Sequence, residues 1–379
     1  MSTTLRSGRS VEDFISYART SPLGNHFRTE QYNHALEARV KLPLGTLFGS
    51  VEAVHEALDN LEVQFLANRE AHLHFAVLSD FTDAATEHRD GDDEIVAAAE
   101  AMRARALKVD APADAVDTCG TGGDGAHTYN ISTAVAFIVA GCGVPVAKHG
   151  NRAASSRSGA ADVLAALGVN IEAPPAVTAR AIREANVGFM WASLHHRAFA
   201  QVAAVRRKLG VRTLFNALGP LTNPAGARRQ LMGVYDRALC EPLAKALIEL
   251  GAVHAWVVAG EDGLDELTTT GASFVSEAKT GAVRSFTVTP EDAGLARARP
   301  DDLKGGDPEE NAAALRRVLD GERGPYRDIA LLNAAATLIV AGRAATLREG
   351  AALAGRSIEE GRARAALARL VAISTAPAP

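Results

Sequence analysis

Short apolar runs alternate with alanine-rich runs from Thr133 to the end of the chain, and this alternation constrains the fold more than any other feature. Four runs have the length and apolar character of buried strands: Val144–Ala147, Val187–Trp191, Gln230–Tyr235 and Ala255–Gly260. Runs of helical length lie between and after them: Ser158–Gly168, Ala176–Ala185, Leu239–Gly251, Ile329–Ala341, and a pair within Ala345–Ser374. Strand–helix alternation is typical of α/β folds. We therefore predict a largely parallel sheet flanked by helices.

Length and composition limit the class of protein. The 379 residues suffice for two domains, or for one large domain with a smaller lobe. The net charge of −5 argues against a general affinity for nucleic acid or anionic membranes. Three cysteines without metal-like spacing indicate a reducing compartment. The longest apolar stretch, Ala134–Ala147, is too short to span a bilayer, so we expect a cytoplasmic protein without membrane attachment.

The first 90 residues follow a different pattern. They are polar and rich in turn residues, with one candidate amphipathic helix at Ser50–Ala67 and one candidate strand at His72–Asp80. A run of charges with a glycine, His88–Glu94, marks a plausible boundary.

The stretch Asp117–Thr133, DTCGTGGDGAHTYNIST, contains a G-x-G-x-x-G pattern at Gly120, Gly122 and Gly125. A dinucleotide site would need an acidic residue about 20 positions further on, and that window is basic. Glycines also let backbone N–H groups approach an anion, and the N-terminus of the helix that opens at Ile131 attracts phosphate. We therefore interpret the stretch as a phosphate-binding loop.

A second loop, KHGNRAASSRSG at Lys148–Gly159, follows the next predicted strand. It combines cations with Asn, Ser and Gly, and two such loops at neighbouring strand ends could hold a ligand with more than one phosphate. Asp265 and Glu266 follow another strand in GEDGLDELTTTG, and we expect both carboxylates to be exposed. Beside phosphate loops they are candidate Mg²⁺ ligands, because Mg²⁺ is held by one or two carboxylates plus phosphate oxygens and water. Arg206, in VRRKLGVRTLFNALGPLTNPA, could bind a planar carboxylate in a bidentate manner, through two parallel hydrogen bonds.

Together these four motifs resemble the anthranilate phosphoribosyltransferase family of tryptophan biosynthesis, over roughly residues 92–371. The resemblance implies a nucleoside phosphorylase/phosphoribosyltransferase-like fold, with an α/β domain at 92–379 and a smaller helical lobe to which residues near 196–217 contribute. It implies an enzyme that transfers phosphoribose from 5-phosphoribosyl 1-diphosphate to the amino group of anthranilate, releasing diphosphate, with Mg²⁺ as cofactor. It also implies a homodimer.

The resemblance carries site roles over to matching positions. The residues implied for phosphoribosyl diphosphate are Gly120, Gly123, Asp124, Thr128, Asn130, Ile131, Ser132, Thr133, Lys148, His149, Gly150, Asn151, Arg152, Ala153, Ala154, Ser155, Ser156 and Ala160. Those implied for anthranilate are Gly120, Asn151, Arg206, His149 and His196, and those for Mg²⁺ are Ser132, Asp265 and Glu266. No further catalytic residue is implied. The family commonly has proline where Ser193 and Arg197 stand.

The front of the chain departs from the family. About 80 residues of helices normally precede the glycine loop, whereas 119 residues precede Gly120, and residues 1–88 lack the helical pattern. We therefore expect an atypical segment at 1–91 in place of the usual lobe, with a weakened dimer and low anthranilate turnover. Two alternatives stay open, a pyrimidine nucleoside phosphorylase-like enzyme and a non-catalytic nucleic-acid-binding relative of the fold.

Overall fold

The computed structural model describes residues 91–153, 157–197 and 214–376. The chain divides into two compact units, one comprising Met1–Arg105 with His196–Asn216 and the other Ala106–His195 with Ala217–Pro379. The expected helix at 50–67 and strand at 72–80 lie outside the described residues. The expected domain boundary at residue 91 stays a prediction for the same reason. Within the described part of the first unit, α7 spans Gly91–Arg105.

The second unit is built on one seven-stranded sheet. Its strands are β1 (Val116–Gly120), β2 (Val146–Gly150), β3 (Val187–Trp191), β4 (Arg229–Gly233), β5 (His254–Gly260), β6 (Ser273–Lys279) and β7 (Ala282–Val288). The order across the sheet is β3-β2-β1-β4-β5-β6-β7. The first five strands in this order are parallel, and β6 and β7 are antiparallel. The predicted fold class, with a largely parallel sheet, is confirmed.

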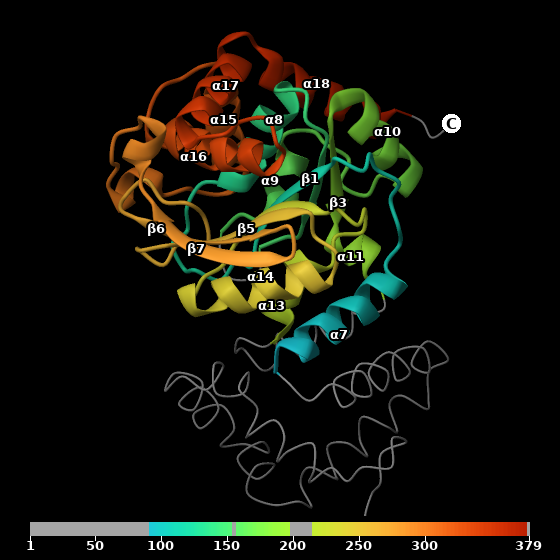
Figure 1. The fold of residues 1–379 in the computed structure, drawn as a ribbon. Helices are drawn as coiled ribbons and strands as arrows, with labels where there is room; N and C mark the ends of the chain where they lie inside the picture. The colour runs from blue at the N-terminus through green and yellow to red at the C-terminus, as the bar shows by residue number, and fades with distance from the viewer. Residues whose placement is uncertain (1–90, 154–156, 198–213, 377–379) are drawn as a thin grey trace, which may run out of the picture. The chain divides into compact units, whose positions relative to one another are not determined.

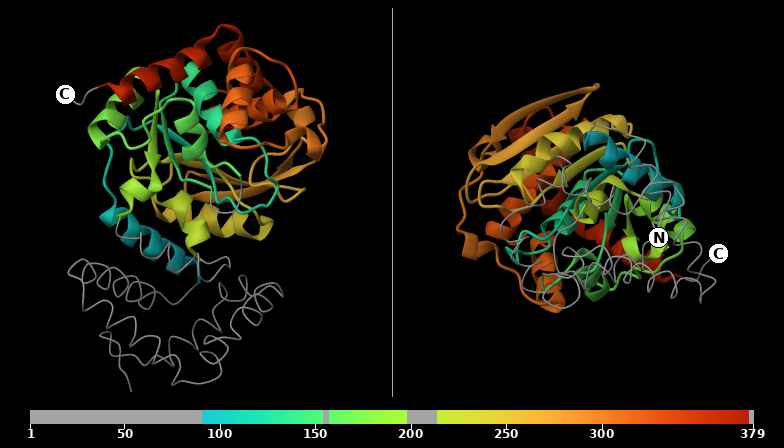
Figure 2. Two further views of the ribbon diagram at one scale, coloured as in Figure 1. Left: turned by 180° about the vertical axis from the view of Figure 1, so that it is seen from behind. Right: turned by 90° about the horizontal axis from the view of Figure 1, so that it is seen from below.

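Helices cover both faces of this sheet (Figure 1). They are α8 (Ile131–Gly141), α9 (Ala160–Ala166), α10 (Pro175–Ala185), α11 (Ala192–His195), α13 (Leu214–Leu221), α14 (Cys240–Glu249), α15 (Pro308–Leu319), α16 (Pro325–Val340), α17 (Leu347–Glu359) and α18 (Arg362–Thr375). On one face α8 contacts β1 and β2, and α16 contacts β4 and β5. On the other face α14 packs against β5, β6 and β7, as the view from behind also shows (Figure 2). Within the described residues, no helix is long and apolar enough to cross a membrane.

Helix α8 lies at the centre of the unit because its sequence, ISTAVAFIVAG, is apolar on all sides. Every residue of α8 except Ser132 is buried. A helix of this kind is stable only when it is packed all round. Accordingly α8 lies between the sheet and the helices α16, α17 and α18. This packing fixes the N-terminus of α8 at the edge of the sheet where the parallel strands end.

A buried polar network supports the antiparallel edge of the sheet. The Glu277 carboxylate accepts hydrogen bonds from His254 Nε2 at 2.8 Å, Trp256 Nε1 at 3.1 Å and Arg284 at 2.9 Å. Burial alone would raise the pKa of Glu277, but these hydrogen bonds outweigh it and hold the pKa below its ordinary value. Burial lowers the pKa of His254, so its imidazole is neutral near neutral pH and donates to Glu277. The network ties β5, β6 and β7 together.

Candidate functional site

The candidate site is at the edge where the five parallel strands end. Their last residues are Gly120, Gly150, Trp191, Gly233 and Gly260. Four of the five positions therefore carry no side chain. Ligands of open α/β sheets bind outside the carboxyl ends of the strands. Here the loops that follow β1, β2 and β5 can approach the strand ends closely.

The loop after β1 is a turn-rich segment held against its neighbours. Gly122, Gly123 and Gly125 have φ values of +65°, +79° and +72°, a region that favours glycine. The Gly122 N–H donates to Asp265 Oδ2 at 2.7 Å, and the Thr121 N–H donates to the Gly233 carbonyl at 2.9 Å. The loop then leads into α8 at Ile131. The structure thus has the predicted arrangement of a glycine-rich loop directly before the N-terminus of a helix.

The segment just before α8 is held by another part of the chain. Thr128 forms an isolated antiparallel bridge with Lys304, and the Tyr129 N–H donates to the Leu303 carbonyl at 3.0 Å. The ring of Tyr129 stacks on Tyr326 with 4.4 Å between centroids. The residues between the glycine loop and α8 are therefore anchored by the segment before α15 and by α16.

Asn130 is the residue before α8, and its side chain bonds other residues of the protein. Its amide nitrogen donates to the Ser158 carbonyl at 3.1 Å, and its amide oxygen accepts from Asn311 at 2.9 Å. The Tyr326 hydroxyl donates to the Asn130 carbonyl at 3.1 Å. Asn130 thus joins the two candidate phosphate loops. Sequence reasoning missed Asn311 and Tyr326, because they come from helices almost 200 residues further on.

Glu266 is buried and Asp265 is half-buried, so the expectation that both carboxylates would be exposed is wrong. Glu266 is 8% exposed and Asp265 is only partly accessible. The loop after β5 packs onto the strand ends, and a Cβ on Gly233 would lie 1.6 Å from the Asp265 carbonyl oxygen. Side-chain-free strand ends therefore allow the acids to lie against the sheet.

The electrostatics of this pair follow from burial. Burial and then the nearby carboxylates of Asp124 and Glu266 raise the pKa of Asp265 well above its ordinary value. Burial raises the pKa of Glu266 to about 8, although the Lys148 ammonium and the Ser132 N–H oppose this. The Glu266 carboxyl thus lies at the N-terminus of α8, where a negative charge is favoured. Two buried acids with raised pKa values form a site that a cation would stabilise in the ionised state.

Lys148 lies beneath the two loops. It is 2% exposed, and its ammonium donates to the Thr118 carbonyl. Burial lowers its pKa, against the opposing effect of Asp117. Asp117 accepts from the His149 N–H at 3.1 Å and from Asn223 at 2.7 Å. The Lys148 ammonium therefore lies close enough to offset the negative charges of Asp117 and Glu266. Asn223, from the TNPA end of the predicted motif, has a structural role because it binds Asp117.

The second loop is organised by Asp162 in the first turn of α9. Its carboxylate accepts from the backbone N–H groups of Ala153 at 2.9 Å and Gly159 at 3.0 Å, and from Arg152 at 2.7 Å. Burial alone would raise the pKa of Asp162, but these hydrogen bonds outweigh it and lower the pKa. Asp162 thereby closes the loop on itself, a role that sequence reasoning did not assign.

Asn151 lies at the mouth of this loop. Its amide oxygen accepts from Trp191 Nε1 at 3.0 Å and from the Ser193 hydroxyl at 3.3 Å. The proline that the resemblance leads us to expect at the Ser193 position could not make the second bond. The Arg152 guanidinium lies 5.4 Å from the centre of the Trp191 ring.

Most predicted site residues meet at this edge of the second unit, though some do not fall within it. Ala154, Ser155, Ser156 and Arg206 lie outside the described residues. His196 is buried and belongs to the first unit. In the described ranges, no three His, Cys, Asp or Glu side chains are grouped so as to hold a metal by themselves. A metal at the acid pair would therefore need oxygens from a ligand or water.

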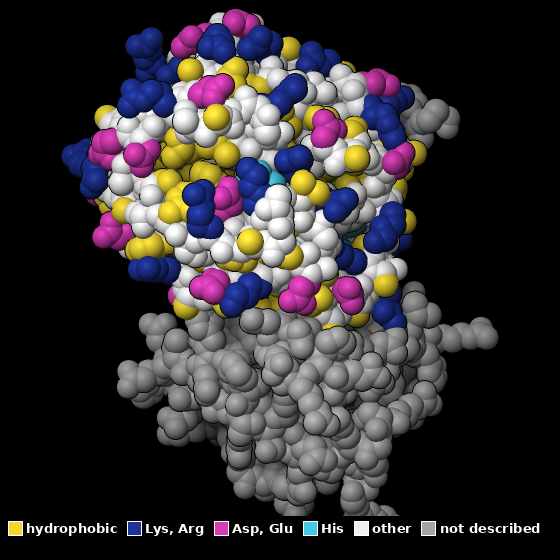
Figure 3. Space-filling view, in the orientation of Figure 1, with side chains coloured by type: hydrophobic (Ala, Val, Ile, Leu, Met, Phe, Trp, Pro, Cys, Tyr) yellow, Lys and Arg dark blue, Asp and Glu magenta, His cyan; other side chains and the backbone are white. Residues whose placement is uncertain are grey.

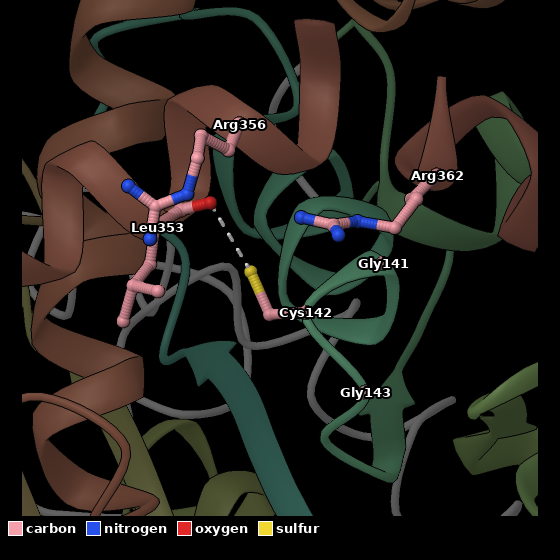
Figure 4. A pocket seen from close by; sticks show the side chains of 6 residues that line it. All are labelled: Gly141, Cys142, Gly143, Leu353, Arg356 and Arg362. Atoms are coloured by element: carbon pink, nitrogen blue, oxygen red, sulfur yellow. Dashed lines mark hydrogen bonds between the residues drawn. The ribbon is translucent and has the colours of Figure 1, made fainter. Parts of the chain in front are cut away.

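A cavity of about 420 Å³ lies elsewhere in the second unit, at the C-terminus of α8 (Figure 4). It is lined by Gly141, Cys142, Gly143, Leu353, Arg356 and Arg362. The Cys142 thiol points into it, 3.6 Å from the Leu353 carbonyl (Figure 4). Burial raises the pKa of this thiol despite the arginines. This opening contains none of the predicted site residues.

The described part of the face shown in Figure 3 has no stripe of basic side chains of the kind that binds nucleic acid. On the face shown in Figure 3, acidic and basic side chains of the described residues are interspersed. A nucleic-acid-binding face would gather Lys and Arg along one stripe.

Comparison with known proteins gives consistent matches. A family model described as "Glycosyl transferase family, a/b domain" matches residues 112–364. A protein of Parvibaculum lavamentivorans named anthranilate phosphoribosyltransferase is 62% identical over 279 residues, which are 74% of this chain and 82% of that protein. One of the same name from Beijerinckia indica is 60% identical over 282 residues, with coverages of 74% and 82%.

Solved structures agree with these matches. The anthranilate phosphoribosyltransferase of Thermus thermophilus aligns with a TM-score of 0.73 and 43% identity, covering 83% of this chain and 99% of that one. The enzyme of Saccharomyces cerevisiae, in complex with phosphoribosyl diphosphate and Mg, aligns with a TM-score of 0.70 and 30% identity, with coverages of 75% and 80%. Neither alternative reading, phosphorylase or nucleic-acid-binding relative, is favoured by these matches.

Proposed function

The chain belongs to the anthranilate phosphoribosyltransferase family, and from this premise we propose how its residues carry out the reaction. The enzyme transfers phosphoribose from phosphoribosyl diphosphate to the amino group of anthranilate in tryptophan biosynthesis, giving N-(5-phosphoribosyl)anthranilate and diphosphate. The observation that carries the assignment of roles is the acid pair: the half-buried Asp265 contacts the glycine loop, and the buried Glu266 contacts the first turn of α8.

Phosphoribosyl diphosphate is proposed to bind along the ends of β1 and β2. The glycine loop and the first turn of α8 offer backbone N–H groups to the diphosphate. The loop at 148–159 offers Arg152 and its backbone to the ribose phosphate. The bonds from Asn130 to Ser158 and Asn311 support this role, because they hold both loops in one arrangement before the substrate arrives.

The donor set fits Mg²⁺. Carboxylate oxygens are ligands of the hard kind that Mg²⁺ prefers, and buried acids with raised pKa values gain most from a nearby cation. We assign Asp265, Glu266 and the Ser132 hydroxyl to the metal. When bound, Mg²⁺ would offset the negative charge that grows on the leaving diphosphate. The Lys148 ammonium remains beneath the site, where it limits the repulsion between the carboxylates.

For the acceptor we keep the roles that the family resemblance implies: Arg206 would pair with the anthranilate carboxylate, and Gly120, Asn151, His149 and His196 are assigned to the same substrate. The anthranilate amine is neutral and needs no strong base. The protein's contribution is to hold this amine in line with C1 of the ribose while water is excluded. No nucleophilic side chain is required, and Cys119 acts as a small buried residue.

Assembly and location complete the proposal. We place the enzyme in the cytoplasm as a homodimer, and we expect this dimer to be weak if the segment 1–91 stands in place of the usual helical lobe.

The metal assignment is tested with Asp265→Ala/Glu266→Ala. Mg²⁺-dependent loss of anthranilate fluorescence should disappear, and thermal unfolding measured on the same samples shows whether the variant is folded at the assay temperature. Glu359→Ala/Glu360→Ala is the matched control, since it removes two adjacent exposed acids at the C-terminal end of α17. Near-normal activity of the first variant at saturating Mg²⁺ would exclude the assignment.

A further inference from the structure

Asn333, in the middle of α16, holds the residue that follows the acid pair. It is completely buried. Its amide oxygen accepts from the Leu267 N–H at 2.9 Å, and its amide nitrogen donates to the Leu267 carbonyl at 2.8 Å. The amide nitrogen also donates to the Ile329 carbonyl of its own helix at 2.9 Å. The side chain therefore bonds both backbone groups of one residue, as a neighbouring strand would.

Leu267 needs such a partner because of where it lies. It is buried but belongs to no strand, since β5 ends at Gly260 and β6 begins at Ser273. A buried peptide group without a hydrogen bond costs free energy comparable to that of a lost bond. The rest of this connection has internal bonds, including Thr268 Oγ1 to Asp262 at 2.8 Å and the Thr268 N–H to Ser273 at 2.9 Å. Asn333 instead joins the connection to a helix.

The helix is a firm base for this contact. Helix α16 packs against β4, β5 and α8, and most of its residues are buried (Figure 1). Leu267 directly follows Glu266, so fixing its peptide groups fixes the backbone from which the Glu266 side chain starts. We infer that Asn333 is a positioning residue for the metal-binding acids, acting through Leu267. This inference rests on the proposed role of Asp265 and Glu266.

The test compares three variants with the wild type. Asn333→Leu keeps the branched shape of the side chain, although it is larger, and loses all three bonds. Asn333→Ser is smaller and too short to reach Leu267, and it serves if the leucine variant does not fold. Thr337→Val is the matched control, because it removes a buried bond to the Asn333 carbonyl within the same helix and leaves Leu267 untouched.

The main readout is calorimetric titration of Mg²⁺ in the presence of phosphoribosyl diphosphate, with the thermal unfolding midpoint measured in parallel. We expect the Mg²⁺ dissociation constant to rise at least tenfold in the Asn333 variants and less than twofold in Thr337→Val, even where the midpoints fall equally. The KM for anthranilate should change less than twofold in all three. An Mg²⁺ affinity of the Asn333 variants equal to that of Thr337→Val would overturn the inference. Absence of Mg²⁺ binding by the wild type would overturn the proposed metal site itself.

Discussion

Replacing Gly233 by alanine tests whether the strand ends must lack side chains. Gly233 ends β4, pairs with Gly120 of β1, and is outside the left-handed region of φ. Alanine is therefore compatible with the backbone, and the effect comes only from the added methyl group. That Cβ would lie 1.6 Å from the Asp265 carbonyl oxygen and 2.4 Å from its carbonyl carbon.

The size of the effect follows from this geometry. A Cβ comes no closer than 3.0 Å to a neighbouring atom, so the Asp265 backbone must move by about 1.4 Å, the difference from 1.6 Å. Overpacking of this kind costs about 1–3 kcal/mol of stability. A misplacement of roughly 1 Å in a positioned group can reduce the rate about 100-fold, equivalent to about 2.7 kcal/mol. We therefore expect kcat/KM to fall at least ~100-fold, beyond what any loss of fold explains.

The assay is the loss of anthranilate fluorescence at several Mg²⁺ concentrations, with thermal unfolding measured on the same samples. Gly355→Ala is the control, since the nearest atom to its added Cβ is Arg327 Nη2 at 3.9 Å. Alanine within α17 should raise stability by roughly 0.5–1 kcal/mol and leave turnover unchanged. A Gly233→Ala enzyme with activity within threefold of the wild type would refute the argument that the methyl group displaces the acid pair.

Three further predictions concern other parts of the chain. A charge-assisted contact contributes about 1.5–3 kcal/mol, so Arg206→Ala should lower kcat/KM for anthranilate roughly 10- to 100-fold. The affinity for phosphoribosyl diphosphate should change little. Equal losses for the two substrates would indicate a structural role for Arg206. Glu277 and His254 both have lowered pKa values in the folded protein, so the unfolded chain binds their protons at a higher pH and the free energy of unfolding falls as pH drops below about 6.5. In denaturant titrations at acid pH, Glu277→Gln should make the free energy of unfolding less dependent on pH. An unchanged pH dependence would contradict the role of the network. Calorimetry and light scattering should show normal phosphoribosyl diphosphate binding, weak anthranilate binding and a mass below that of a full dimer, whereas tight anthranilate binding by a stable dimer would show that residues 1–88 form the usual lobe.

The apolar strands could be predicted from the sequence because burial on both faces leaves a continuous signal. The predicted Val187–Trp191 coincides with β3, and Gln230–Tyr235 lies within two residues of β4 at each end. The strand β1 was not among the predicted runs, because its sequence VDTCG contains few apolar residues, and β6 and β7 were missed as well. Their sequences, SFVSEAK and AVRSFTV, mix polar and apolar residues, and β7 is largely exposed. A half-exposed edge gives no such signal.

The motifs of the site could be predicted, but their supports could not. The glycine loop and the second loop were recognised from short local patterns. Asn333, Asn311 and Tyr326 act across the fold, at positions that no local pattern marks as functional. The burial of Asp265 and Glu266 was also hidden, because two adjacent acids in a glycine-flanked loop are usually solvated. Their burial depends on Gly120 and Gly233, more than 30 residues away, which leave room for the loop.

The glycines at the strand ends also limit how this enzyme can be changed by evolution or in the laboratory. Many α/β enzymes acquire new chemistry by exchanging side chains at the carboxyl ends of strands. Here a Cβ at Gly120, Gly233 or Gly260 would lie 2.3, 1.6 or 2.4 Å from an oxygen of the loop after β5. Substitutions that alter substrate choice should therefore occur in the loops and not at these three glycines. A saturation library of the whole chain would show them as intolerant positions although none carries a reactive group.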